Sequence, residues 1–348
     1  TNDSYRPDAA KRPAELGLPI EQAWLYRPEE QWTYSHHPHL AFFDGRFFAM
    51  WSNGRRDEDA PGQRVLYATS TDFRRWSEPS PLLGPLAGRH SELVLTAAGF
   101  HSHAGRLVAY VGAYEYRSES LDEQGNRPRE DRDHVDTTLL AVTTSDGDRW
   151  ENPIDLRVPI IPNFGPEPTA SGRLIISGNI SFPYTDDPTG LSGRQMAGIY
   201  PGAPGGRFVD DSESFKKLYE VDDRPVPTCE GSFYQTDDGV LHMLLRTNTD
   251  RLWVTESSDD GRTWSEPRPT GFSDNGTKFH FGRLPDGRFY YVGSPDAEPR
   301  GARERLILSL SDEGTRFDRH LILADGTTPY EQHAEGMHKG GEYGYPHA

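Results

Sequence analysis

A short motif that recurs along the chain constrains its fold more than any other feature. The motif is Ser-x-Asp-x-Gly-x-x-Trp, and its full-length copy occupies residues 257–264. Three shorter or weaker copies occupy 70–76, 144–150 and 311–317. In such a segment an Asp or Ser side chain bonds backbone N–H groups, Gly supplies a positive φ, and the aromatic residue packs between strands. We therefore predict a turn between two β-strands at each copy, with a structural and not a catalytic role.

The full-length motif resembles the Asp-box, or BNR repeat, of the sialidase-like β-propeller superfamily. The copies are separated by about 74, about 114 and about 53 residues, which fits one blade per roughly 50 to 75 residues with one degenerate copy skipped. Such proteins arrange four-stranded blades radially about a central channel. The resemblance therefore implies an all-β fold, namely a single β-propeller whose blades carry Asp-box turns.

The hairpins set the expected number of blades. Several pairs of alternating segments meet at a tip made of a small or acidic residue followed by Gly. These tips are Asp44-Gly45, Ala104-Gly105, Ser171-Gly172, Asp238-Gly239 and Asp286-Gly287. A further copy starts at Gly344-Tyr345-Pro346-His347, where the sequence stops inside a strand, which indicates a chain that is cut short or that continues beyond Ala348. We predict six blades, with seven as the alternative and the last blade truncated.

The chain shows a single domain preceded by an arm. Residues 1–22 are rich in Pro, Asp, Ala and Lys without a sustained period, so we expect an N-terminal arm that wraps the surface. No linker divides residues 23–348, which we expect to form the propeller. No stretch approaches the roughly 20 apolar residues of a membrane helix, so no membrane partner is expected. We also expect a monomer.

The charge balance excludes one class of partner. The formal net charge is −17, from 54 acidic and 37 basic residues. Since no basic face is available to release counterions, nucleic acid is not expected to bind. An anionic small substrate is compatible with this charge, because a local pocket can be basic on an acidic protein. The chain starts at Thr1 and not Met, which indicates processing or trimming. We expect secretion or a periplasmic location, with the cytoplasm as the alternative.

The hairpin register predicts which residues share one face of the propeller. Residues just before the first strand and just after the second strand of each blade converge on one mouth of the channel. These positions are rich in side chains that can hold a carboxylate or move protons near neutral pH. The candidate residues are His36, His37, Asn53, Tyr114, Tyr116, Arg117, Glu167, Asn179, Arg194, Glu230, Arg246, Asn248, Lys278, His280, Tyr345 and His347.

Roles within this set follow from residue type and position. The adjacent imidazoles of His36 and His37 precede a Pro at a strand entrance, which leaves at least one of them pointing into the mouth. Glu230 starts a strand, either as a general acid or as a partner of loop backbone. The candidates for catalysis are His37, His36, Tyr114, Tyr116, Arg246 and Glu230, and we assign substrate binding to the others.

No cofactor is expected to be required. The His residues show no tight metal-ligand spacing, and Cys229 is the single cysteine. Calcium held by backbone carbonyl oxygens is the one structural ion that the sequence leaves open. We interpret His39, which alternates with apolar residues on a strand, as packed in the interior.

Three short segments resemble propellers that cut linkages between rhamnose and glucuronic acid. The segments are Ser35-His36-His37-Pro38-His39, Trp51-Ser52-Asn53-Gly54 and Glu58-Asp59-x-Pro61-Gly62-Gln63. That group includes ulvan lyases, rhamnosyl-glucuronate lyases and an α-L-rhamnosidase. The resemblance implies a uronic-acid-containing glycan as the partner, and His, Tyr and Arg as the catalytic residue types. Sialidases instead carry an early Arg-Ile-Pro-type signature, for which Tyr26-Arg27-Pro28 is a poor substitute, so sialidase activity is not expected.

Two enzymatic hypotheses and one binding hypothesis follow. In β-elimination, Arg and Asn neutralise the uronate carboxylate, Tyr or His takes the C5 proton, and Tyr or His protonates the leaving oxygen. In hydrolysis, as in the rhamnosidase, an acid and a base flank the bond, with Glu167 and Glu230, or His37 and the substrate carboxylate, as candidates. The mouth residues favour a lyase, because they include more cations and phenols than acids. The third hypothesis is a non-catalytic glycan-binding propeller.

Overall fold

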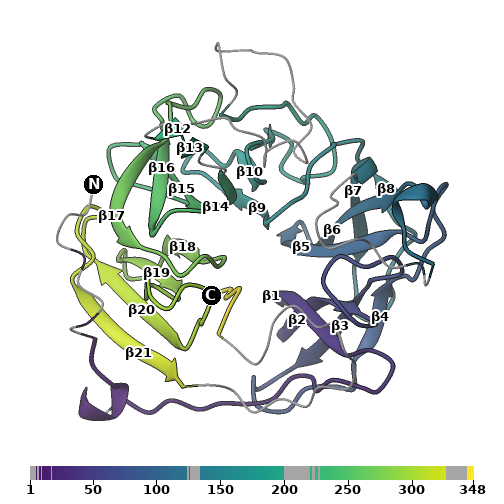
Figure 1. Ribbon diagram of the computed structural model, residues 1–348, viewed down its shortest axis with the longest axis horizontal. Coiled ribbons are helices and arrows are strands. Elements are labelled where there is room, and N and C mark those ends of the chain that lie inside the picture. Colours follow the sequence, from purple (N-terminus) through teal and green to yellow (C-terminus); the bar gives the residue numbers. More distant parts are fainter. Residues whose placement is uncertain are drawn as a thin grey trace.

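The computed structural model describes residues 5, 8, 10–16, 18–123, 125, 134–199, 220–221, 224–225, 228–326 and 343–348. Among them, five antiparallel sheets of three or four strands stand around a common centre (Figure 1). This radial layout is a β-propeller and confirms the predicted fold class. No helix within these ranges has both the length and the apolar character needed to cross a membrane.

The blades follow one another in chain order. The first comprises β1 (Tyr34–Phe43), β2 (Arg46–Gly54), β3 (Arg64–Ser70) and β4 (Ser80–Leu83). The second comprises β5 (Val94–His103), β6 (Arg106–Tyr116), β7 (His134–Thr144) and β8 (Ile154–Asp155). The third comprises β9 (Phe164–Pro168), β10 (Leu174–Ser177) and β11 (Tyr184–Thr185). The fourth comprises β14 (Thr228–Gln235), β15 (Leu241–Thr247), β16 (Arg251–Ser257) and β17 (Arg268–Ser273). The fifth comprises β18 (His280–Arg283), β19 (Phe289–Gly293), β20 (Arg305–Ser311) and β21 (Arg319–Asp325).

Short elements lie outside the blades. They are the ribbon of β12 (Glu220–Val221) and β13 (Arg224–Pro225) and two 3-10 turns, η2 (Pro13–Leu16) and η3 (Ser118–Ser120). Every predicted hairpin tip joins the first and second strands of a blade. The Gly residue of each tip has a positive φ, for example 75° at Gly45 and 74° at Gly105. The first strands β1, β5, β9, β14 and β18 therefore line the centre (Figure 1).

The repeated motif forms the predicted turn between the third and fourth strands of a blade. In the full-length copy, Ser257 Oγ accepts from the Gly261 N–H at 2.9 Å and donates to Asp259 Oδ1 at 2.9 Å. Asp259 in turn accepts from the N–H of Thr263 at 2.8 Å, and the Trp264 ring contacts Phe182 at 5.0 Å. The other three copies use the same Ser or Thr oxygen, which accepts from the N–H of Phe73, Gly147 or Gly314.

The end of the chain differs from the prediction. Residues 343–348, where a further blade was predicted to begin, form no strand and run into the centre of the ring (Figure 1). The N–H of Tyr343 donates to Arg303 O and the N–H of Ala348 to His280 Nδ1, so these groups bond the fifth blade and not a neighbouring strand. The described residues thus contain five blades, and the third has three strands where four were expected.

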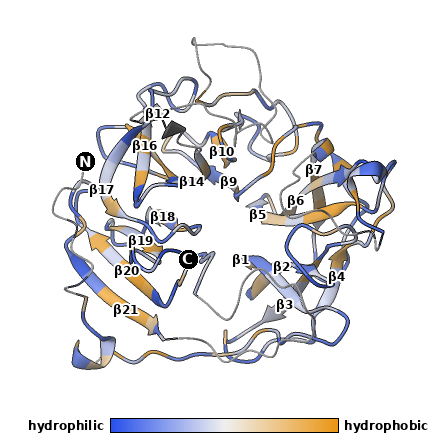
Figure 2. Ribbon diagram, viewed as in Figure 1, coloured by the Kyte–Doolittle hydropathy of each residue, from blue (hydrophilic) through white to orange (hydrophobic). Residues whose placement is uncertain are grey.

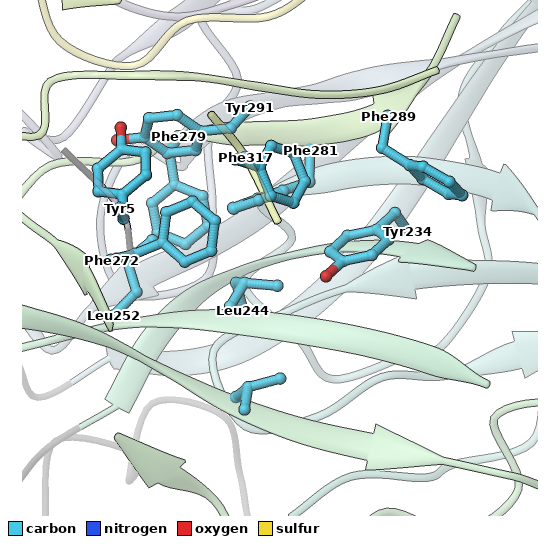
Figure 3. Packing of buried hydrophobic residues seen from close by; sticks show 11 residues of the cluster. Tyr5, Tyr234, Leu244, Leu252, Phe272, Phe279, Phe281, Phe289, Tyr291 and Phe317 are labelled. Carbon is cyan, nitrogen blue, oxygen red and sulfur yellow. The ribbon is translucent and has the colours of Figure 1, made fainter. Parts of the chain in front are cut away.

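The core lies within and between the blades, where the apolar residues of the strands concentrate (Figure 2). A large aromatic cluster joins the fourth and fifth blades, with Phe272, Phe281 and Tyr291 packed together (Figure 3). Tyr5, from the N-terminal arm, inserts into this cluster at 4.6 Å from the Phe272 ring. Neighbouring blades are also joined by polar bonds, since Ser232 Oγ of β14 accepts from the Phe281 N–H of β18 at 2.9 Å. The site described below is therefore held by a rigid frame.

Candidate active site

Three non-glycine residues with left-handed backbone meet at one mouth of the channel. His37, Glu230 and Tyr345 have φ values of 52°, 52° and 61°. His37 and Glu230 each lie where the pairing register shifts, in β1 and β14. Such a conformation costs on the order of 1–3 kcal/mol per residue, and outside turns it is a feature of functional sites. Since these three positions come from distant parts of the chain, their meeting indicates a functional site.

Tyr345, Glu230 and Arg246 form a bonded triangle. The Tyr345 hydroxyl donates to Glu230 Oε1. Arg246 Nη1 lies 2.7 Å from Glu230 Oε2 and 3.0 Å from the Tyr345 oxygen. Burial, and then the charge of Glu230, raise the pKa of Tyr345 well above its usual value, while Arg246 opposes this shift. The phenol is therefore protonated near neutral pH, with an ionisable carboxylate directly accepting from it.

A pair of imidazoles covers the ring of Tyr345. The His36 ring lies 3.8 Å from the Tyr345 ring and stacks on His37 at 4.0 Å. Glu58 Oε1 lies 3.2 Å from His36 Nδ1. His37 Nδ1 lies 3.3 Å from Ser52 Oγ, and this oxygen accepts a hydrogen bond from the Ala97 N–H of the second blade. These contacts orient both imidazoles toward the phenol.

Two groups have the residue types of a metal site. His36, His37 and Glu58 each offer a ligand atom within 4.8 Å of the others. Because the two imidazoles stack with only 18° between their planes, a single ion cannot lie in the plane of both rings. In the other group, His90, Glu115 and Asp136, both oxygens of Glu115 already accept backbone N–H groups. Neither arrangement favours a bound ion, and structural calcium stays a prediction.

A second layer of channel residues lies two positions further along each inner segment. His39 follows His37, His347 follows Tyr345, and His280 follows Lys278. The backbone at His37 and Tyr345 is left-handed and not extended, so strand alternation does not account for those two pairs. The ring of Phe164 is at the centre of this layer, with His280 stacked on it at 4.6 Å.

Lys278 lies between the two layers. Its side chain is almost fully buried, donates to the carbonyl of Asn163 and lies 4.0 Å from the centroid of the Phe164 ring. Burial lowers the pKa of Lys278 to about 7, against the opposing charges of Glu230 and Glu167. The amine therefore titrates close to neutral pH.

His280 and Glu167, both predicted to bind substrate, instead bond each other. His280 Nδ1 accepts from the Ala348 N–H at 3.0 Å, so the ring proton is on Nε2, which donates to Glu167 Oε1 at 3.0 Å. Burial lowers the pKa of His280 to about 3, in agreement with a neutral ring. Both ring nitrogens are occupied, so His280 positions Glu167 and the chain end. The expected carboxylate pair of Glu167 and Glu230 is replaced by Glu230 with Tyr345.

Other predicted residues have structural partners. Asn53 donates to Tyr34 O at 3.1 Å and accepts from Arg64 at 2.9 Å, which uses both ends of its amide within the first blade. Asn179 accepts from the Glu230 N–H at 3.2 Å and so holds the strained backbone of that residue. Asn248 is exposed just beyond β15.

Two predicted groups lie apart from Tyr345. Tyr114 and Tyr116 pack on each other and on His134, at ring distances of 4.2 and 5.2 Å from that imidazole. Arg117 lies directly before η3, beside this group. Arg194 donates to Gly190 O at 2.8 Å and lies over Tyr110, toward the hairpin-tip end of β6 and away from the mouth. No described contact joins these residues to the triangle around Tyr345.

Sequence reasoning underestimated Glu58 and His39. Glu58 was given no role of its own from the sequence, yet it orients His36. His39 was read as packed, and it is fully buried, yet it faces the channel next to His347. The signal was present in the pattern His37-Pro-His39, which recurs as Tyr345-Pro-His347. His37 and Arg246, both predicted at one mouth of the channel, each contact Tyr345.

Fold and site together define an Asp-box β-propeller with a polar channel mouth. The protein-family model described as BNR repeat-like domain matches residues 45–348. The chain therefore belongs to the BNR repeat-like domain family. A search of curated protein sequences finds no match.

Solved structures share the fold at low sequence identity. A protein of unknown function from Dyadobacter fermentans is 15% identical with a TM-score of 0.58, over 83% of this chain and 81% of that one. A mutant of the NanB sialidase from Streptococcus pneumoniae is 13% identical with a TM-score of 0.57, over 89% of this chain and 65% of that one. The Trypanosoma rangeli sialidase is 15% identical with a TM-score of 0.57, over 86% and 49%. The chain thus spans less than two thirds of the length of these sialidases.

Proposed function

We propose that the protein is a carbohydrate-active enzyme of the glycoside hydrolase type, with Tyr345 as the nucleophile. The observation that carries the proposal is the triangle of Tyr345, Glu230 and Arg246. A phenol is a poor nucleophile until a base takes its proton, and Glu230 already accepts that proton's hydrogen bond. A Tyr nucleophile is also the known departure of sialidases from the usual two-carboxylate mechanism, and sialidases share this fold.

The chemistry requires two steps, each with two proton transfers. The Tyr345 oxygen attacks the anomeric carbon while its proton passes to Glu230, and the bond to the leaving oxygen breaks. His36, oriented by Glu58, donates a proton to that oxygen. Water then cleaves the glycosyl–tyrosine bond after losing a proton to the same imidazole, and Glu230 returns its proton to Tyr345.

The substrate is an acidic sugar. Arg246 lies at the nucleophile, and the Arg303 guanidinium lies 5.6 Å from the centroid of the Tyr345 ring. Guanidinium groups hold carboxylates with paired hydrogen bonds. A carboxylate next to the anomeric carbon would therefore bind beside Tyr345 and place that carbon near its oxygen.

Replacing the nucleophile tests the proposal. Fluorogenic glycosides of sialic acid, glucuronic acid and L-rhamnose report which sugar is released, and kcat on the best of them is measured. We expect Tyr345→Phe to lower kcat by roughly 10³-fold or more, since removal of a nucleophile costs at least this much. Tyr67→Phe, on β3 and away from the channel, is the matched control and keeps wild-type activity. Full activity of Tyr345→Phe would reject the mechanism.

A second candidate is β-elimination at a rhamnose–glucuronate linkage. The contact of His36, His37 and Tyr345 beside Arg246 favours it, because imidazole and phenol can serve as base and acid while the guanidinium neutralises the uronate. Ulvan digestion distinguishes the two reactions, since elimination produces an ultraviolet-absorbing unsaturated uronate and hydrolysis does not. Hydrolysis that releases L-rhamnose would support the rhamnosidase form of the first candidate. Binding to uronate oligosaccharides without any turnover would support a glycan-binding propeller.

A further inference from the structure

Beneath Tyr345, three buried ring nitrogens of two imidazoles lack hydrogen-bond partners among the described residues. His39 is fully buried, and neither of its ring nitrogens has a partner. His347 Nδ1 is also buried without a described hydrogen-bond partner, and the centroids of the two rings lie 5.1 Å apart. A neutral imidazole always carries one N–H donor, and a buried donor without an acceptor is unfavourable. His39 therefore needs a polar group that the described residues do not supply, and Nδ1 of His347 is available to the same group.

Lys278 adds a positive charge to the same place. It forms no ion pair with any described residue, and its one described acceptor is the carbonyl of Asn163. No described carboxylate forms an ion pair with Lys278: Glu230 bonds Tyr345 and Arg246, and Glu167 bonds His280 through Oε1, while its Oε2 is buried without a described partner. A buried charge is expensive unless it is paired, so an uncompensated ammonium in the channel calls for an anion.

These three groups surround a single ring. The ammonium of Lys278 lies 4.0 Å from the centroid of Phe164, and the rings of His39 and His347 lie 5.7 and 5.8 Å from it. The group thus combines one ammonium with two imidazoles, of which Lys278 and His39 are almost fully buried. A metal cation would be repelled by Lys278, whose charge, after burial, also lowers the pKa of His39. The donors and the charge favour an anion.

We propose that Lys278, His39 and His347 form a buried site for a small anion, of the size of a halide or a carboxylate group. The anion accepts from the ammonium and from one N–H of each imidazole, which satisfies all three side chains at once. Lys278 lies 6.0 Å from the centroid of the Tyr345 ring, so the site adjoins the candidate nucleophile.

The anion has two sources. One is a free inorganic ion such as chloride, which needs no substrate. The other is the carboxylate of the acidic sugar, and this source rests on the proposed function. If the site holds a free inorganic ion, chloride leaves KM for the acidic sugar unchanged. If it holds the carboxylate of the sugar, chloride competes with the substrate and raises KM in the wild type but not in Lys278→Met.

Thermal unfolding tests the site itself. The wild-type chain is titrated with sodium chloride or sodium formate, with sodium gluconate at equal ionic strength as the bulky reference. We expect a saturable rise in Tm of roughly 2 °C with the small anions, because a ligand that binds only the folded state stabilises it. Lys278→Met abolishes this rise, and Lys11→Met, which removes the same charge from the exposed arm, retains it. An equal response in Lys278→Met, or no response in the wild type, would overturn the proposal.

Crystals of the wild type give a second readout that does not depend on a variant folding. After soaking in sodium bromide, we expect an anomalous peak within hydrogen-bond distance of Lys278 Nζ, and density for water alone there would refute the site. The outcome is separable from the proposed function. Tyr345→Phe keeps the anion response whether or not it loses turnover, because its hydroxyl contributes nothing to the site.

Discussion

At the scale of single residues, Lys278 makes the stability of the protein depend on pH. Its pKa falls from 10.5 to about 7 on folding, because burial disfavours the ammonium. Between these values the unfolded chain binds more protons than the folded chain, so this residue makes the free energy of unfolding rise with pH. Below about pH 7 Lys278 is protonated in both the folded and the unfolded chain, so the whole free-energy cost of burying the ammonium lowers the stability of the folded protein.

Lys278→Met removes this dependence. We expect the variant to gain stability over the wild type at low pH, and this gain should shrink steadily as pH rises from about 7 to 10.5. Urea unfolding at several pH values across that range, in gluconate to keep small anions away, measures the difference. Lys11→Met serves as the control, because its difference from the wild type in the free energy of unfolding should not change with pH. A gain for Lys278→Met that is independent of pH would contradict the assigned burial.

Residue by residue, the sequence predicted the site where the hairpin register alone determines position. His37, Glu230 and Arg246 lie near strand ends, and all three contact Tyr345, which belongs to no strand. Arg194 lies in a loop after β11, and loop paths do not follow from strand alternation. Register also says nothing about partners, which is why the pairing of His280 with Glu167 was not foreseen.

At the scale of elements, the Asp-box turn is a device for stability. Asp259 bonds Ser257 Oγ, the Thr263 N–H and the Thr263 hydroxyl, which fixes the connection of β16 to β17. We expect Asp259→Ala to lower the free energy of unfolding by about 1–2 kcal/mol, because donors in the turn lose their acceptor. Denaturant unfolding measures the loss, and kcat/KM should stay at the wild-type value.

The matched control for this turn is Asp250→Ala. Asp250 is an exposed carboxylate whose ion pair with Arg251 is long, at 3.6 Å, so its removal should change stability little. An equal loss for both variants, or a fall in activity for Asp259→Ala alone, would argue against a purely structural turn.

The same elements explain how far the fold could be predicted. Turn chemistry is local, so the Asp-box copies and the Gly tips identified every blade that the structure describes. Whether a segment pairs as a strand depends on a neighbour that local sequence cannot reveal. Residues 343–348 have the pattern of an inner strand, yet their described backbone bonds go to Arg303 and His280. The prediction of a strand there was wrong for this reason.

At the scale of the whole molecule, the N-terminal arm links the fifth blade to the first along the outer edge (Figure 1). Lys11 adds a short parallel bridge to β21 through Leu321. Further along, Glu21 pairs with Arg74 at 2.5 Å, and Tyr26 packs against Trp51 of β2 at 5.4 Å. Because the candidate site combines His36 and His37 of the first blade with a C-terminal segment that bonds the fifth blade, this connection helps to keep the two in place.

Tyr5 is the anchor of the arm, and its removal tests the connection. Its ring is buried among Phe272, Tyr291 and His320, and its hydroxyl lies 3.3 Å from Ser309 Oγ. Tyr5→Ala leaves a cavity between aromatic rings, so we expect a loss of about 3 kcal/mol in unfolding free energy and a lower Tm. Trp24→Ala, which truncates a larger ring just after the arm, where 56% of the residue is exposed, should change Tm little. If the two variants lose equal stability, the arm stabilises the ring by its general coverage and not through the Tyr5 anchor.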